Sequence, residues 1–109
     1  MTIEDTIYQY YEAMLQGQME KSQELLDWDN KEASLIDYYA NIRKLHKEYH
    51  LVSLEDLEIM TLFEKDGIGN ADVKMTYLDK NGIERIEINK VNFRVDSKDT
   101  WKITSIKIE

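Results

Sequence analysis

Two histidines, His46 and His50, are the first residues to consider for chemistry, because they stand four positions apart. On a helix this spacing places both imidazoles on one face, where they could share a metal ion. Glu48 occupies the third position of the segment rather than the second, so it points away from that face and the zinc-protease motif is not met. We therefore predict no metal site and no cofactor.

Tyrosines and carboxylates form the second set of candidates. Proton transfer at carbon needs a carboxylate base and a hydrogen-bond donor, commonly a tyrosine. The tyrosines of the first predicted helix, and the carboxylates at places that could line a pocket, are Tyr8, Tyr10 and Tyr11, and Asp27, Asp29 and Glu87. No set of them matches a known catalytic motif, so we assign no catalytic residue. Tyrosines at helical spacing are typical of amphipathic core positions.

The sequence lacks the residues and motifs that other classes of catalysis need. Cysteine is absent, which excludes a disulfide framework, a thiol nucleophile and a thiolate metal site. Neither histidine is accompanied by a nucleophile motif, and no phosphate-binding loop occurs, because the four glycines all fall in predicted turns. The sequence therefore favours a protein that is not an enzyme.

The charge of the chain is divided unevenly between its halves. Residues 1–60 hold 13 acidic and 5 basic side chains and residues 61–109 hold 9 of each, so the whole net charge of -8 lies on the first half. An acidic surface repels nucleic acid and anionic membranes, so we expect direct binding to neither. It could attract a basic protein partner, but it is more typical of a solvated helical face that keeps the protein soluble.

A single domain over residues 1–109 is predicted, with helices over about 2–50 and strands over about 55–108. Met1 leads directly into polar residues, which is unlike a secretory signal. No apolar stretch is long enough to cross a bilayer. We therefore expect a cytoplasmic protein.

Three helices are predicted in the first half, because apolar residues recur there at spacings of three and four. The first begins at Thr2, an N-cap with Asp5 in the capping-box position, and ends at Gly17. A short second helix ends near Trp28, and a third carries its apolar stripe on to Tyr49.

The pattern changes from helical spacing to alternation after about Leu54, which predicts roughly four strands in an antiparallel meander. Turn signals separate the strands at Asp66-Gly67, at Asp79-Lys80-Asn81-Gly82 and at Asp96-Ser97-Lys98-Asp99. The predicted fold class is therefore α+β, with three N-terminal helices packed on a roughly four-stranded antiparallel meander.

One register, without a bulge, accounts for the apolar residues of the last hairpin. It pairs Phe93 with Trp101, Val91 with Ile103, Ile88 with Ile106 and Ile86 with Ile108. Across the preceding turn it pairs Met75 with Ile86 and Val73 with Ile88. The two apolar sets then lie on opposite faces, and the helices can cover only one of them. We predict a homodimer formed through the sheet, unless strong curvature folds one end of the sheet over the helices.

Under this register a polar group of residues borders an apolar one. The candidate pocket or interface residues are Tyr11, Glu87, Asn89, Phe93, Trp101, Ile103 and Ser105. A gradient from apolar to polar suits a small-molecule pocket with a polar mouth, and it equally suits the exposed end of a sheet.

The segment from Ile7 to Gly17, IYQYYEAMLQG, resembles the first helix of the nuclear transport factor 2-like superfamily. The strands Ala71-Asp72-Val73-Lys74-Met75 and Trp101-Lys102-Ile103 resemble strands of that superfamily, and among its branches the chain looks most like small bacterial domains of unknown function. The resemblance implies a cone-shaped fold, in which a curved sheet wraps around a long helix, and dimers through the sheet. The superfamily contains isomerases, dehydratases, hydrolases and many non-catalytic binding domains, so it does not select a function.

Three functions stay open. The leading hypothesis is a non-catalytic binding or interaction domain whose ligand is unknown. The second is an acidic inhibitor or regulator of a basic, nucleic-acid-binding protein, whose capture would depend strongly on salt. The third is a small-molecule isomerase or dehydratase, which would need a closed cavity holding a carboxylate of raised pKa.

Overall fold

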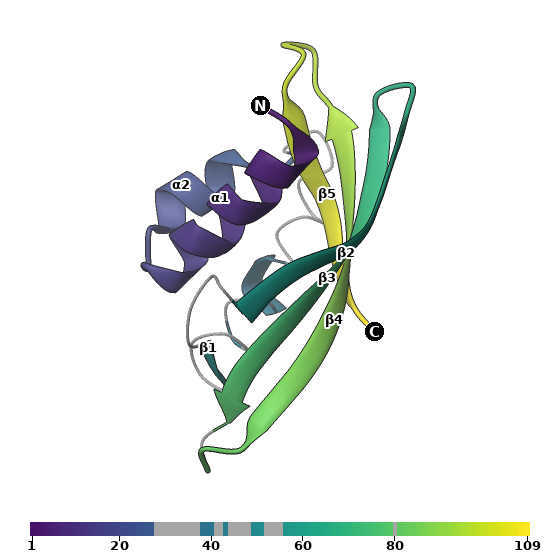
Figure 1. Ribbon diagram of the computed structural model, residues 1–109. Helices are drawn as coiled ribbons and strands as arrows, with labels where there is room; N and C mark the ends of the chain where they lie inside the picture. Colours follow the sequence, from purple (N-terminus) through teal and green to yellow (C-terminus); the bar gives the residue numbers. More distant parts are fainter. Residues whose placement is uncertain (28–37, 41–42, 44–48, 52–55, 80) are drawn as a thin grey trace.

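The computed structural model describes residues 1–27, 38–40, 43, 49–51, 56–79 and 81–109 (Figure 1). Its first element is helix α1, Ile3–Leu15. The hydroxyl of Thr2 accepts a hydrogen bond from the backbone N–H of Asp5 at 3.1 Å, and the Asp5 carboxylate accepts one from the Thr2 N–H at 3.0 Å. This reciprocal pair is the predicted capping box, and hydrogen bonding of the Asp5 carboxyl to the backbone N–H and to the side chain of Thr2 lowers its pKa.

Helix α2, Met19–Glu24, follows α1 after a tight reversal. Gly17 takes a positive φ of 70° just beyond α1, which is the conformation that a glycine adopts most readily at a helix end and confirms its predicted place there. After α2 the chain runs along the edge of the sheet, where Leu26 forms an isolated parallel β-bridge with Ile103. The backbone N–H of Asp27 donates a hydrogen bond to the Ile103 carbonyl oxygen at 2.8 Å.

The rest of the described chain is an antiparallel sheet. Its strands are β1 (Tyr49–Leu51), β2 (Leu57–Lys65), β3 (Ile68–Asp79), β4 (Glu84–Val95) and β5 (Trp101–Ile108). Strands β2 to β5 pair in sequence order, and β1 pairs with β3 on the same side as β2, near the other end of that strand. Helices α1 and α2 lie against one face, which we call the inner face; the other is the outer face (Figure 1).

The predicted turn signals form the hairpin connections. Asp66 and Gly67 both have positive φ, 53° and 76°, as a two-residue hairpin turn between β2 and β3 requires. The Asp79 carboxylate accepts hydrogen bonds from the backbone N–H groups of Asn81 and Ile83, chiefly that of Ile83, which lowers its pKa. Between β4 and β5, the Asp96 carboxylate likewise accepts hydrogen bonds from the backbone N–H groups of Lys98 and Thr100.

The predicted arrangement of three N-terminal helices packed on the sheet is wrong. In the part of the chain that the structure describes, α1 is the one helix longer than six residues. The third helix was predicted to reach Tyr49, but Tyr49–Leu51 forms β1, because it pairs with the end of β3. Most of that predicted helix, residues 28–37, 41–42 and 44–48, lies outside the described residues. The main element of the described chain is the four-stranded antiparallel meander of β2 to β5.

The predicted strand register is also wrong. Val73 pairs with Asn89 and Met75 with Glu87, one residue away from their predicted partners Ile88 and Ile86. In the last hairpin Phe93 pairs with Ile103 and Val91 with Ile106, two and three residues beyond prediction. A bulge between these two pairs leaves Thr104 as an extra residue of β5.

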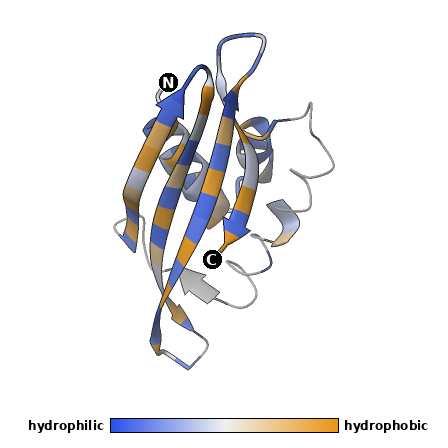
Figure 2. Ribbon diagram, turned by 90° about the vertical axis from the view of Figure 1, so that its right-hand side faces the viewer, coloured by the Kyte–Doolittle hydropathy of each residue, from blue (hydrophilic) through white to orange (hydrophobic). Residues whose placement is uncertain are grey.

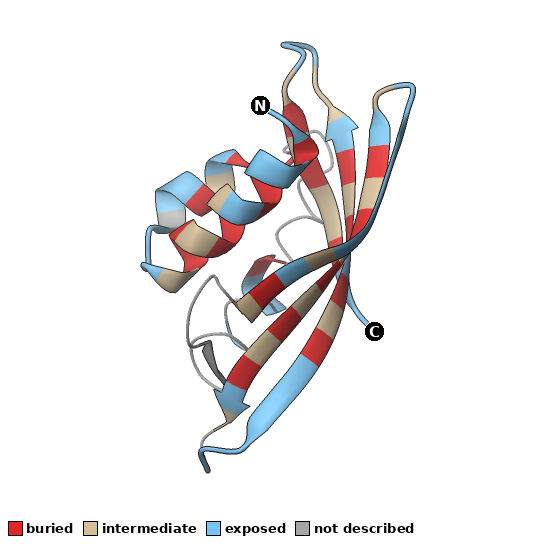
Figure 3. Cartoon of the chain, viewed as in Figure 1, coloured by how far each residue is buried: buried red, intermediate tan, exposed pale blue. Residues whose placement is uncertain are grey.

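These shifts bring both predicted apolar sets largely to the inner face. The fully buried strand residues Ala71, Val73, Val91, Phe93 and Ile103 share that face with α1, where Tyr10 and Tyr11 pack edge to face at a ring-centroid distance of 5.3 Å. Figure 3 shows the buried positions of α1 turned toward the sheet. The core is therefore a single layer between helix and sheet.

The outer face lacks the continuous apolar patch on which the homodimer prediction rested. Charged residues from neighbouring strands occupy its middle, and large apolar residues lie toward its two ends. The charged residues are Asp72, Lys74, Lys90 and Lys107, and the apolar ones are Phe63, Ile68, Leu78, Ile86 and Ile88. The alternating hydrophilic and hydrophobic bands along the strands in Figure 2 follow the alternation of outward-facing and inward-facing residues. Dimerisation through the sheet stays a prediction, but the apolar patch that motivated it is not present on the described outer face.

Candidate functional site

Three polar side chains meet on the inner face, and we call them the inner polar cluster: Tyr11 from α1, and Glu87 and Asn89 from β4. The Asn89 side-chain N–H donates a hydrogen bond to the Tyr11 hydroxyl oxygen at 2.9 Å. Tyr11 and Asn89 are fully buried, whereas Glu87 keeps 8% of its surface exposed. The cluster therefore runs from the core toward solvent along β4.

Burial decides the protonation state of Tyr11. Desolvation raises the pKa of its phenol well above the ordinary value, and the nearby Glu87 charge raises it further, against the opposing effect of the Asn89 hydrogen bond. The phenol therefore stays protonated. Because its oxygen accepts from Asn89, its O–H hydrogen is left to donate to another acceptor.

Asn89 brings an acceptor to the same place. Its carbonyl oxygen Oδ1 is buried and has no hydrogen-bond partner. A buried polar atom without a partner costs about 1–3 kcal/mol relative to one that is hydrogen-bonded. The cluster thus offers one unmet acceptor on Asn89 and the phenolic donor of Tyr11.

The apolar half of the predicted site belongs to the core. Phe93, Trp101 and Ile103 are buried in the layer between the sheet and the helices. Ser105 lies on the outer face, where its hydroxyl accepts a hydrogen bond from the Asn92 side chain at 2.8 Å, so its grouping with Glu87 was wrong. The bulge in β5 is the reason, because it reverses which face the residues beyond Ile103 present.

The other residues considered for chemistry do not join this cluster. Asp27 is paired with Arg94, with 2.8 Å between its Oδ2 and the guanidinium nitrogen. His50 lies in strand β1 rather than on a helix, so the helical spacing that suggested a shared metal does not apply to it. His46 and Asp29 lie outside the described residues. Among the described residues, no group of three or more histidines and carboxylates is placed to hold a metal ion.

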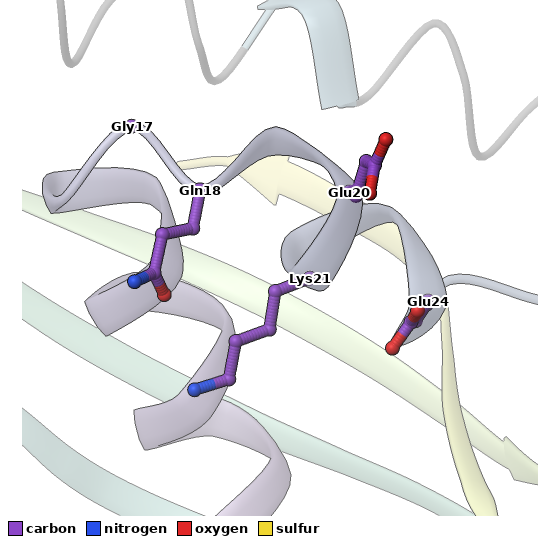
Figure 4. Close-up of a pocket in the computed structure, with 5 residues that line it drawn as sticks. All are labelled: Gly17, Gln18, Glu20, Lys21 and Glu24. Atoms are coloured by element: carbon purple, nitrogen blue, oxygen red, sulfur yellow. The ribbon is translucent and has the colours of Figure 1, made fainter.

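Surface hollows are also present on the described part of the chain. A groove of about 460 Å³ between α1 and β2 is lined by Glu4, Tyr8 and residues 57–62. A hollow of about 280 Å³ lies beside the loop between β4 and β5. A third, at the reversal between α1 and α2, is lined by Gly17, Gln18, Glu20, Lys21 and Glu24; Figure 4 shows Gln18 and Lys21 extending to one side and Glu20 to the other.

Comparison with known proteins identifies a similar fold and no family. No family model matches the chain, and no curated protein matches it. The chain is similar to the solution structure of a SEC-C motif containing protein from Rhodopseudomonas palustris, with a TM-score of 0.69 and 18% identity over 89% of this chain and 70% of that chain. At this identity the likeness shows the fold alone. None of the described helices is long and apolar enough to cross a membrane.

Proposed function

We propose that this chain is a non-catalytic binding domain that holds a small polar ligand at the inner polar cluster. The supporting observation is the fully buried carbonyl oxygen of Asn89, which has no hydrogen-bond partner beside a phenol that keeps its proton. A bound molecule that donates to this oxygen would remove the cost of leaving it unmet.

The chemistry of the cluster limits what it would bind. A ligand must donate to Asn89 and can accept from Tyr11, as a primary amide or a hydroxyl-bearing ring does. The Glu87 carboxyl at the exposed end of the cluster disfavours an anion and favours a neutral or cationic group.

A matched pair of variants tests the proposal. Small amides, alcohols and amines are used as probes in ligand-observed NMR with the wild type, Asn89→Leu and Asn92→Leu. Asn92 lies on the outer face of the same strand, so its variant controls for loss of an amide in β4. We expect probes that bind the wild type and Asn92→Leu but lose binding to Asn89→Leu. Equal binding to all three proteins, or no binding to any, would contradict the proposal.

The enzymatic alternative uses the same residues. A protonated Tyr11 close to Glu87 has the elements of a donor and a base, as an isomerase or dehydratase needs. We propose binding without turnover because no set of these residues matches a known catalytic motif. Screening with generic ester, enone and epoxide substrates tests this choice, and turnover lost in Tyr11→Phe would establish the enzyme instead.

The resemblance to the nuclear transport factor 2-like superfamily and a cytoplasmic location are proposed alongside this function. A helix lying along the inner face of an antiparallel sheet supports the first, and the acidic, cysteine-free composition supports the second. Neither is needed for the binding test.

A further inference from the structure

Strand β2 lies at the edge of the described sheet. It pairs with β3 along one side, and no other described strand pairs with its second side. Such an edge presents backbone N–H and C=O groups that an added strand can use. A bulge at Met60 interrupts the hydrogen-bond ladder between β2 and β3. Such a bulge hinders aggregation through edge-to-edge pairing of sheets. Preference for one partner would then depend on the side chains around the edge.

Apolar side chains are exposed along this strand. Met60 is 49%, Leu62 41% and Phe63 55% exposed, a concentration that singly scattered surface residues do not produce. Met60 and Leu62 also line the groove between α1 and β2, which Tyr8 borders from the helix side. Among the described strands, an unpaired strand edge therefore lies beside a partly apolar groove.

The charge of the groove indicates which class of partner segment it favours. Glu4 of α1 and Glu58 of β2 line it, and none of the described residues that line it is basic. Residues 1–27, which include both helices, hold six acidic side chains and one basic one. An added strand with alternating basic and apolar residues would turn its apolar side chains toward Tyr8 and Leu62 on the helix side and its basic side chains toward Glu58 on the outer face.

We propose that the edge of β2 and the groove beside α1 bind an extended segment of another protein, in which basic and apolar residues alternate, as an added β-strand. Main-chain hydrogen bonds to β2 supply affinity, and the groove supplies preference for the alternating side chains. This surface is distinct from the inner polar cluster, so either proposal can fail without the other.

A second copy of the chain is a less suitable occupant. Antiparallel pairing of two β2 edges about a two-fold axis would bring the α1 helices to the same side of the joined sheet. Their first turns carry Glu4 and Asp5, so the acidic surfaces would face one another. The groove therefore favours a basic partner over self-pairing.

A synthetic ten-residue peptide of alternating lysine and valine is the probe, and the same peptide with glutamate for lysine is its control. Isotope-labelled protein is titrated with each and followed by amide NMR. We expect the lysine peptide to shift the amides of residues 57–65 and the first turn of α1, with affinity that falls as salt rises. We expect no binding of the glutamate peptide.

Two apolar-to-charged variants at exposed strand positions localise the site. Leu62→Lys should weaken binding of the lysine peptide about tenfold or more, whereas Ile86→Lys, on the outer face away from β2, should leave it unchanged. If Leu62→Lys does not fold, Tyr8→Lys on the helix side replaces it.

Three results would overturn the proposal. They are equal binding of the two peptides, shifts confined to other elements, and absence of binding by the lysine peptide. Sedimentation velocity of the protein alone adds a further outcome, because a dimer abolished by Leu62→Lys would identify the occupant as a second copy.

Discussion

The Asn89 side-chain nitrogen lies 2.9 Å from the Tyr11 hydroxyl oxygen and donates a hydrogen bond to it, between residues 78 positions apart in the chain. This bond ties α1 to the middle of β4 inside the core. Both side chains are buried, so neither can exchange its partner for water without local opening. The pair should therefore behave as an energetically coupled unit.

Replacing Tyr11 with phenylalanine keeps the ring and removes the hydroxyl. Asn89 would then keep no partner for its N–H in addition to its unmet carbonyl oxygen, so the free energy of unfolding should fall by about 1–3 kcal/mol. In the double variant Tyr11→Phe/Asn89→Leu the loss should be smaller than the sum of the two single losses. Urea denaturation of the four proteins measures this, and strict additivity would show that the two side chains are independent.

The raised pKa of Tyr11 predicts a loss of stability at alkaline pH. The unfolded phenol titrates near its ordinary value of 10.0, whereas the folded one titrates higher. The stabilisation is thus complete below the unfolded pKa and is lost as pH rises above it, because the unfolded state then releases the proton first. Urea midpoints measured from neutral pH to pH 11 should fall less steeply in Tyr11→Phe than in the wild type. Equal slopes would contradict this prediction.

The ion pair between Arg94 and Asp27 fixes the segment after α2 to the sheet. The Asp27 side chain is 4% exposed and that of Arg94 is 44% exposed. Arg94→Met should therefore cost more than Asp27→Asn, since only the first variant leaves a buried carboxylate without its cation. We expect a loss of about 1–3 kcal/mol for Arg94→Met, measured by urea denaturation. If Arg94→Met lost less free energy of unfolding than Asp27→Asn, the ion pair would not be what stabilises this segment.

The local signals in the sequence predicted local structure well. The capping box at Thr2, the end of α1 at Gly17 and the hairpin turn at Asp66-Gly67 each depend on one or two residues, and each is present. They fix their own neighbourhood, because their hydrogen bonds and φ angles involve no distant partner.

Register is a long-range property, and its prediction failed where the inner face turns polar. Glu87 and Asn89 point inward on β4, while Ile86 is 58% exposed on the outer face, so the apolar alternation gives the wrong parity there. A binding site in the core would produce this conflict between pattern and fold. The link from Asn89 to Tyr11 depends on this register and could not be read from spacing.

Gly69 is a further position that sequence reasoning misplaced, because it lies inside β3 rather than in a turn. A Cβ added there would stand 2.5 Å from Cδ1 of Ile3 and 3.1 Å from the carbonyl oxygen of Phe63. The start of α1 thus approaches the sheet where the strand has no side chain. Gly69→Ala should lower the free energy of unfolding by about 1–3 kcal/mol, because the buried Ile3 side chain and the Phe63 carbonyl must give way to the added methyl.

Shortening Ile3 separates the two contacts at this position. Ile3→Val removes Cδ1 at a cost of about 0.5–1.5 kcal/mol of its own. In that background the added methyl of Gly69→Ala meets mainly the Phe63 carbonyl oxygen, so its further cost should shrink. Urea denaturation of the wild type, both single variants and the double variant gives the coupling. An equal cost of Gly69→Ala in both backgrounds would show that the strand backbone, and not the packing of α1, requires a glycine here.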